Sequence, residues 1–235
     1  MMRLCFRRFL CSACLMIASA LGAVVSAQHF YSPNLAIGVK GGMTLSNMQF
    51  SPSVEQGMLQ GKLIGVAVRY TEEKLFGLIG EVNLEQRGWK EKFEDNPEFE
   101  YSRTLTYLQV PILTHIYFGG KNVKCFVNLG PSVGYMLSNS ISSNFDYTNP
   151  TSVPGFPLQY RTTEQMKMEV SKKFDYGITG GIGVEFRIRR RHHLQLEGRY
   201  YFGLGNIFPD RKKDYFAASR GTSIQVTLGY LFRIK

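Results

Sequence analysis

The chain is poor in cysteine and, beyond its first 27 residues, has no long apolar run. Three of its four cysteines, Cys5, Cys11 and Cys14, lie in that first segment, so Cys125 has no partner for an internal disulfide. A membrane-spanning helix needs about 20 mostly apolar residues, and no segment after residue 27 approaches that length. These absences exclude a disulfide-stapled domain and a helical membrane protein.

Positive charge is in excess but scattered. The chain has 28 Lys and Arg against 18 Asp and Glu, a net charge of +10, and three arginines in the first 27 residues account for about three of those charges. A nucleic-acid-binding face needs clustered cations. We interpret the longest run in the rest of the chain, Arg187 with Arg189, Arg190 and Arg191, as a turn. We therefore expect no nucleic-acid partner.

The first 27 residues have the pattern of an export signal. Arg3, Arg7 and Arg8 form a basic start, residues 9–25 are mostly apolar, and Val25-Ser26-Ala27 offers a small-residue cleavage site. This pattern predicts a signal peptide over residues 1–27 and a single domain over residues 28–235.

Apolar and polar residues alternate with period two along the rest of the chain. In residues 76–87, Glu81, Asn83 and Glu85 alternate with Val82 and Leu84, as the two faces of a β-strand would. A soluble sandwich would not bury such a charged face cheaply. The same pattern predicts eight strands, near residues 35–43, 64–70, 76–87, 105–118, 123–137, 174–188, 193–204 and 222–234.

The links between these strands alternate in length. Long links cover residues 44–60, 88–103, 138–172 and 205–221, and short ones lie near 71–75, 119–122 and 188–192. Short periplasmic turns, long external loops and an even number of strands are typical of outer-membrane barrels. In hydrocarbon every backbone amide must be paired, so the sheet must close. We predict an all-β, eight-stranded antiparallel up-and-down transmembrane β-barrel in a bacterial outer membrane, with the arginine turn at the periplasmic rim.

The interior of an eight-stranded barrel is only wide enough for side chains to fill it. Charged residues on the inward faces should therefore pair with one another and leave no open pore. We name this expected set the lumen network, and it consists of Lys40, Arg69, Glu81, Glu85, Arg87, Asp175, Glu185, Glu197 and Arg199.

Glycine, proline and aromatic residues lead to three further expectations about the barrel. Glycines within strands should face inward and make room for closure: Gly38, Gly42, Gly65, Gly130, Gly134, Gly181 and Gly183. Pro111 should interrupt the ladder of its strand by a bulge or a local break. Aromatic residues near strand ends should form interfacial girdles: Tyr70, Trp89, Tyr117, Phe118, Tyr135, Tyr201 and Phe232.

Several segments resemble the PorT-like outer-membrane β-barrel family of the Bacteroidetes. They are Gly38 to Met43 (GVKGGM), Tyr107 to Ile112 (YLQVPI), Asn128 to Gly134 (NLGPSVG), Phe174 to Gly177 with Gly180 to Glu185, and Glu197 to Ile207. The resemblance covers nearly all of residues 28–235 and implies an eight-stranded barrel, often labelled a porin. Its founding member serves a secretion system that exports gingipain-type proteases. Gln109 stands where the family usually carries Glu, so one inward charge is missing.

No residue pattern predicts a catalytic, cofactor or metal site. Neighbouring residues of a strand point to opposite faces, so His192 and His193 should not share a metal ion. His115 with Ser132 suggests a hydrolase pair, but their spacing does not favour it. We expect a non-enzymatic structural or interaction protein, with a secretion accessory, a small-solute channel and a lipid-modifying enzyme as alternatives.

The expected partners are outer-membrane lipid and lipopolysaccharide, together with other envelope or secretion proteins at the long external loops. Residues 88–102 are acidic and residues 208–220 are basic. These two loops could therefore touch each other, or both could simply be solvated.

Overall fold

The computed structural model describes residues 34–71, 75–93, 96, 98–157 and 162–234. The signal peptide predicted over residues 1–27 lies outside these residues and stays a prediction. No helix in the described part of the chain is long and apolar enough to cross a membrane.

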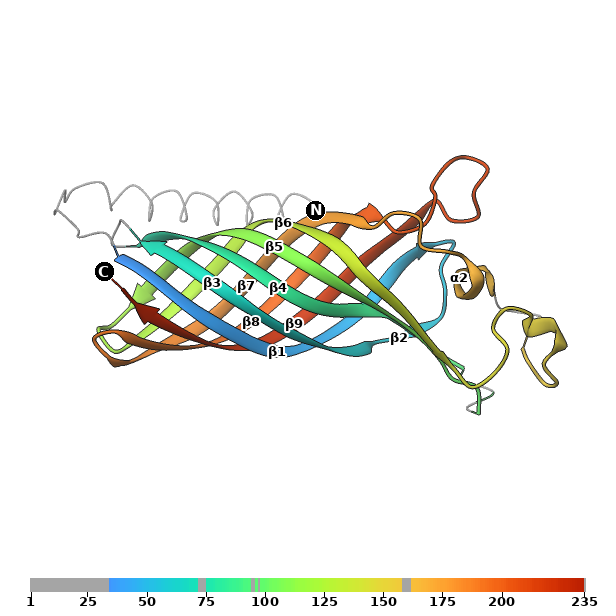
Figure 1. The fold of residues 1–235 in the computed structure, drawn as a ribbon, viewed down its shortest axis with the longest axis horizontal. Coiled ribbons are helices and arrows are strands. Elements are labelled where there is room, and N and C mark those ends of the chain that lie inside the picture. Colours follow the sequence, from blue (N-terminus) through green and yellow to red (C-terminus); the bar gives the residue numbers. More distant parts are fainter. Residues whose placement is uncertain (1–33, 72–74, 94–95, 97, 158–161, 235) are drawn as a thin grey trace, which may run out of the picture. The chain divides into compact units, whose positions relative to one another are not determined.

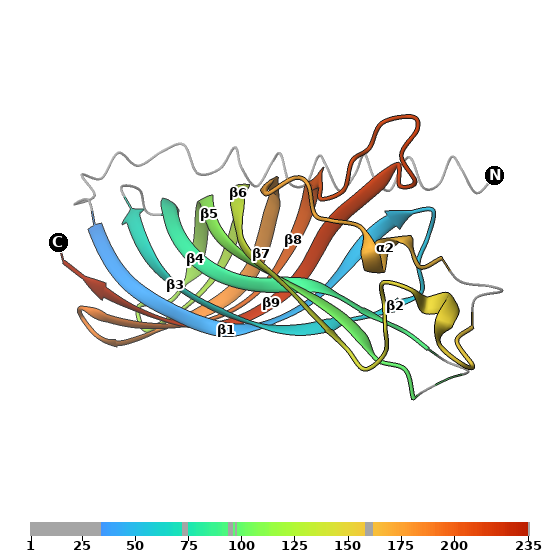
Figure 2. The same ribbon diagram turned by 45° about the vertical axis from the view of Figure 1, so that its right-hand side comes forward.

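Eight long antiparallel strands close into a ring (Figures 1 and 2). Each strand pairs with its neighbours along the chain, and β1 closes the ring on β9 over Ala36–Arg233 to Ser51–Ala218. The predicted up-and-down barrel is confirmed. The strands are β1 (Asn34–Ser51), β3 (Leu59–Thr71), β4 (Phe76–Glu91), β5 (Tyr101–Gly119), β6 (Val123–Ser143), β7 (Phe174–Arg189), β8 (His192–Asn206) and β9 (Ala218–Arg233).

Three short elements lie at the end of the barrel that carries the long links. They are β2 (Gln56–Gly57), which pairs with β4, the 3-10 helix η1 (Pro150–Ser152) and the single-turn helix α2 (Glu164–Lys167). In Figure 1 they lie at the right, whereas β1 begins and β9 ends at the left. By the alternation of link lengths, the left end is periplasmic and the right end is external.

At the periplasmic side of the barrel, the strands begin and end where the sequence predicts. At the external side, the strands are longer than predicted. β5, β6 and β7 stop or start within one residue of the predicted short turns, whereas β1 runs to Ser51 and β6 to Ser143. Where a strand extends beyond the hydrocarbon layer, its outer face no longer contacts lipid and need not be apolar. The alternation of apolar and polar residues therefore fades there, although the backbone pairing of the strands continues. The long links are therefore shorter than predicted.

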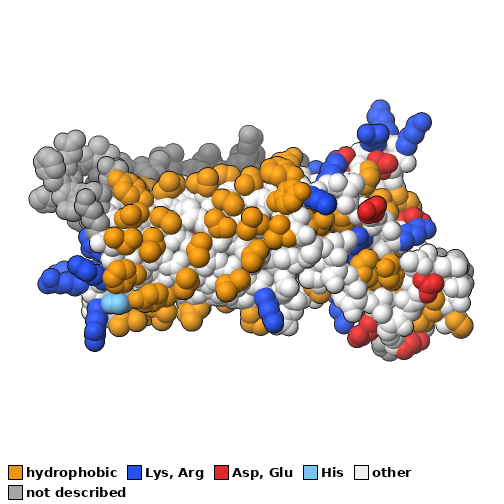
Figure 3. Space-filling view, viewed as in Figure 1, with side chains coloured by type: hydrophobic (Ala, Val, Ile, Leu, Met, Phe, Trp, Pro, Cys, Tyr) orange, Lys and Arg blue, Asp and Glu red, His pale blue; other side chains and the backbone are white. Residues whose placement is uncertain are grey.

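The two faces of each strand differ as the alternation predicts. On the outside, Ile64, Val39 and Ile182 are 65%, 58% and 68% exposed. Figure 3 shows such apolar side chains as a band over the barrel wall, with most charged side chains at the two ends. This outer band is the surface that contacts lipid.

Pro111 interrupts one ladder without shifting it. Pairing between β4 and β5 stops at Gly80–Ile112 and resumes at Asn83–Gln109 in the same register. The expected local break is confirmed, while the bulge lies elsewhere, on β6, where Leu137 is left unpaired opposite Thr106 and Tyr107.

The girdle prediction is wrong for three aromatic residues. Trp89, Tyr117 and Tyr201 are only 0%, 6% and 0% exposed, so they face the interior rather than lipid. Trp89 points to the same inward face of β4 as Glu85 and Arg87, because the three residues are two positions apart. An aromatic residue near a strand end can fill the interior of the barrel instead of joining a girdle. Tyr70, Phe118 and Tyr135 are exposed on the wall, as expected.

A substitution at Gly183 should test the need for small inward residues. A Cβ there would lie 2.3 Å from the Phe126 ring and 2.5 Å from the carbonyl oxygen of Leu196. We expect Gly183→Leu to destabilise the barrel by at least about 1–3 kcal/mol through overpacking. A lower temperature for the heat-induced mobility shift on a gel would show this.

Gly198 is the matched control. A Cβ on this glycine meets nothing within 4 Å, so Gly198→Leu should keep the wild-type midpoint. Equal loss in both variants would contradict the packing argument.

Candidate functional site: a charged lumen under an apolar cap

All nine residues of the lumen network are buried, and Lys40, the most exposed, is at 7%. They come from β1, β3, β4, β7 and β8. Each is buried and alternates with exposed apolar residues of its strand, so each points into the barrel. The structure arranges them in three clusters along the barrel axis.

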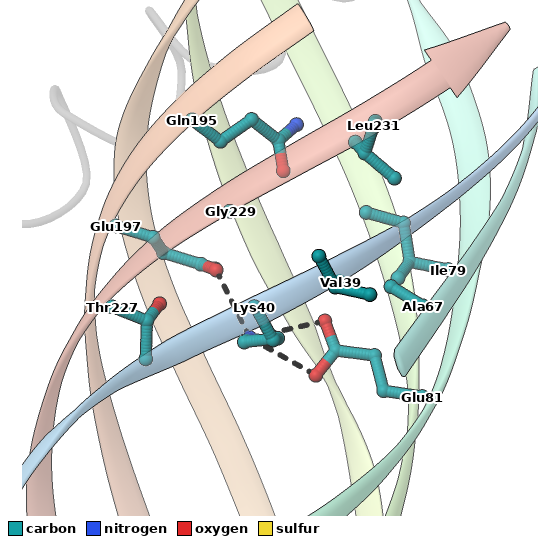
Figure 4. A pocket seen from close by; sticks show the side chains of 10 residues that line it. All are labelled: Val39, Lys40, Ala67, Ile79, Glu81, Gln195, Glu197, Thr227, Gly229 and Leu231. Atoms are coloured by element: carbon teal, nitrogen blue, oxygen red, sulfur yellow. Dashed lines mark hydrogen bonds and ion pairs between the residues drawn. The ribbon is translucent and has the colours of Figure 1, made fainter. Parts of the chain in front are cut away.

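The central cluster is built around Glu81 (Figure 4). Arg199 donates two hydrogen bonds to its carboxylate, at 2.6 and 2.7 Å, and Lys40 Nζ lies 3.1 and 3.2 Å from the same two oxygens. Glu197 completes the cluster, with one carboxylate oxygen 2.6 Å from Arg199 Nε and the other 3.6 Å from Lys40 Nζ. Two cations thus bind two carboxylates inside the barrel, where none of the four residues is more than 7% exposed. Such pairing is what makes buried charge tolerable.

The second cluster lies at the periplasmic side of the lumen around Glu185. Its carboxylate accepts hydrogen bonds from Arg69 and, at 2.8 Å, from Gln195, and it lies 2.8 Å from His193 Nδ1. A further contact, His115 Nδ1 to Asn128 Oδ1 at 2.7 Å, lies between this cluster and the central one.

The third cluster lies toward the external side around Arg87. Its guanidinium donates to Asp175 at 2.8 Å and sits between two aromatic rings, 4.1 Å from the centre of Tyr107 and 4.3 Å from that of Tyr201. Arginine favours this combination of carboxylate pairing and stacking. Glu85, at the same side, accepts hydrogen bonds from Ser223 and Gln225 at 2.9 and 3.0 Å.

Above these clusters the external mouth is closed by an apolar cap. We use this name for the buried cluster Met48, Phe50, Val54, Trp89, Phe93, Tyr101, Leu105, Tyr107, Met136, Phe156, Met166, Val170, Ile207, Phe208 and Phe216. Trp89 packs edge-on against Phe50, with ring centres 5.3 Å apart, and Phe208 and Phe216 follow at 5.8 Å from each other. The loops thus fold inward over the lumen.

Two polar residues of β5 hold α2 over this mouth. The Tyr101 hydroxyl donates to the carbonyl oxygen of Met166 at 2.9 Å, and Arg103 donates to that of Met168 at 2.7 Å. Gln165 of α2 in turn donates to Glu91 at 3.1 Å. The sequence does not reveal this arrangement, because residues 88–103 and 138–172 lack a sustained period-two pattern and their aromatic residues are far apart in the chain.

The loop that follows β8 is fastened at its base. Lys172 and Asn206 donate to the Asp210 carboxylate at 2.7 and 2.8 Å, and these hydrogen bonds hold the pKa of Asp210 below its usual range. The acidic-to-basic loop contact considered for residues 88–102 and 208–220 stays a prediction.

The histidines and Ser132 do not form a reactive group. His193 is buried beside Glu185, whereas His192 is half-buried and lies 2.6 Å from the Tyr230 hydroxyl. Ser132 is buried, and its hydroxyl has no hydrogen-bond partner among the residues described. Within the same residues, no three His, Cys, Asp or Glu side chains gather closely enough to hold a metal ion.

Solved outer-membrane barrels are similar to this chain at low sequence identity. OprG from Pseudomonas aeruginosa matches with a TM-score of 0.50 and 10% identity, over 88% of this chain and 99% of that one. Neisserial surface protein A matches with a TM-score of 0.47 and 12% identity, over 86% and 99%. The outer membrane enzyme PagL gives a TM-score of 0.37 and 11% identity, over 86% and 99%. At 10% identity, the match to OprG shows the fold alone.

No curated protein matches the sequence. The family model of the outer membrane protein beta-barrel domain matches residues 26–209, which is well over half of the chain. The closed ring, the apolar wall and this match agree, and the chain therefore belongs to the outer membrane protein β-barrel domain family and resides in a bacterial outer membrane.

Proposed function

We propose that this protein is a sealed, non-enzymatic barrel with a structural or interaction role in the outer membrane. The observation that carries the proposal is the occupied lumen, in which three clusters of buried charged side chains follow one another under the apolar cap. Two cavities adjoin these clusters, one beside Lys40 and one beside Arg87, and each measures about 10 Å³. That is about the space of a single water molecule.

A sealed lumen predicts no channel activity. In planar bilayers the wild-type protein should give no conductance above leak, because ions would have to displace salt bridges such as Glu81–Arg199. Discrete, reproducible current steps from the folded protein would reject the sealed barrel in favour of a small-solute channel.

We propose that the lumen network stabilises the barrel as a unit. Arg199→Met removes the bidentate partner of Glu81 and leaves buried carboxylates undercompensated, so we expect a loss of about 3–5 kcal/mol in the free energy of unfolding. Denaturant titration of the protein in micelles would measure it.

Lys90→Met provides the control. Lys90 forms an ion pair of 3.5 Å with Glu100, with both side chains about half exposed or more, and exposed pairs contribute about 1 kcal/mol or less. If the two substitutions cost the same, the lumen network has no special role in stability.

The absence of enzymatic activity is part of the proposal. His115 and Ser132 are each about 1% exposed and lie inside the filled barrel, whereas lipid acyl chains contact the outer wall. Deletion of the protein, Ser132→Ala and His115→Ala should each leave the acylation of lipopolysaccharide unchanged in mass spectra of lipid A. Altered acylation in the His115→Ala strain would point to a lipid-modifying enzyme.

We also propose that the chain is a PorT-like barrel that serves as an accessory of a secretion system. The motif resemblance supports this, and so does the cap, in which Tyr101 and Arg103 hold α2 as an ordered external surface. Envelope or secretion proteins, as well as lipopolysaccharide, are the partners we propose for the external end.

A crosslinker in the external link between β6 and β7 tests the secretion role. A photo-reactive residue at the exposed position Thr148 should capture an identified secretion component, whereas one at Ile182 on the lipid-facing wall should not. Capture of no such component at Thr148, or equal capture at both positions, would contradict the proposal.

A further inference from the structure

The periplasmic end of the barrel carries a cluster of cations that the lumen network does not use. We call it the basic rim, and it consists of Lys121, Lys124, Arg187, Arg189, Arg190, Arg191 and Arg233. These residues lie in the turns between β5 and β6 and between β7 and β8, at the adjoining ends of β6 and β7, and at the end of β9. Figure 3 shows Lys and Arg gathered at this end, while both signs of charge occur at the external end.

Backbone hydrogen bonds join the three segments of the basic rim into one surface. The Arg187 N–H donates to the carbonyl oxygen of Asn122, and the Arg233 N–H donates to that of Arg191, both at 2.8 Å. The cations of separate turns are therefore neighbours, and their charges add.

Four cations of the basic rim lack a carboxylate partner in the part of the chain that the structure describes. Glu185, the carboxylate just inside the lumen, is already engaged by Arg69 and His193. Within the part of the chain that the structure describes, Lys121, Arg189, Arg190 and Arg191 form no ion pair, and all four are exposed. An external anion would supply the counter-charge that the described residues do not provide for these four cations.

The basic rim lies at the depth where the hydrocarbon ends. Ile188 is 64% exposed and directly precedes Arg189, and Phe118 and Val123, which flank the turn of Lys121, are 55% and 46% exposed. The turns are too short to carry their cations away from this level, since only residues 190–191 and 120–122 connect the strands. Arg and Lys side chains at such a boundary extend along the apolar surface and place their charges among the headgroups.

We propose that the basic rim is a binding site for the phosphate groups of anionic phospholipids in the periplasmic leaflet. Guanidinium groups match phosphate oxygens in a bidentate geometry, and each cation at an anionic membrane surface contributes about fivefold to binding. The depth of the rim favours lipid over an acidic periplasmic protein, because headgroups surround the wall at this level whereas a protein would contact only the tips of short turns. The site thus goes beyond the sealed-barrel role and does not depend on it.

The test compares two lipids that differ only in headgroup. The full-length chain, folded in zwitterionic micelles, is titrated with fluorescent short-chain phosphatidylglycerol or phosphatidylcholine, and binding is followed by anisotropy. We expect the wild-type protein to bind phosphatidylglycerol about tenfold or more tightly than phosphatidylcholine, since several cations contribute. Salt near 1 M should abolish the preference by screening.

Two triple variants locate the site. Arg189→Ser with Arg190→Ser and Arg191→Ser should reduce the preference to about threefold or less. Arg211→Ser with Lys212→Ser and Lys213→Ser removes the same charge from an exposed loop at the external end and should leave it unchanged. Should the rim variant lack the heat-induced mobility shift of a folded barrel, Arg190→Ser and Lys121→Ser alone should each weaken phosphatidylglycerol binding by about fivefold.

Several outcomes would overturn the proposal. A wild-type protein without headgroup preference would leave an acidic protein as the partner of the rim. Equal loss in both triple variants would show a mere effect of net charge. Displacement of phosphatidylglycerol by millimolar inorganic phosphate would show a free-anion site rather than a lipid site. Neither conductance nor secretion experiments bear on these results, so failure here and failure of the sealed-barrel role are distinguishable.

Discussion

The pairing of β1 with β9 is the interaction on which the rest of the molecule depends. In hydrocarbon an unpaired strand edge would expose a row of N–H and C=O groups, each costing several kcal/mol. The continuous register from Ala36–Arg233 to Ser51–Ala218 removes that edge. Closure then separates two environments, because every strand residue must face either lipid or a narrow interior.

The narrow interior explains why charged residues gather inside a membrane protein. Side chains on the inward faces meet one another at hydrogen-bond distance, as Glu81 does with Lys40 and Arg199, so buried charge is compensated locally. The same narrowness requires glycine where a large side chain of the neighbouring strand covers the inner face, as at Gly183 beside its paired residue Phe126. Filling and closure are therefore two aspects of one constraint.

The two ends of the barrel are built for different surroundings. At the external end, long links bury their aromatic residues over the lumen, and Tyr101 and Arg103 tie α2 to the mouth. At the periplasmic end the turns are short, and arginines directly follow apolar wall residues. A single fold thus combines a structured external face with a charged periplasmic rim. Partner binding is proposed for the first and lipid binding for the second.

The sequence by itself determined the number of strands, their faces and the inward position of the charged residues, because lipid on one side and a packed lumen on the other impose period two on every strand. It did not determine which cation meets which carboxylate. The pairs Arg69–Glu185 and Arg87–Asp175 join residues far apart in the chain, and only the stagger of a closed ring brings them to one level. The inward position of Trp89 and the apolar cap were likewise decided by tertiary structure. Outside the hydrocarbon layer, no contrast between lipid and lumen requires apolar and polar residues to alternate.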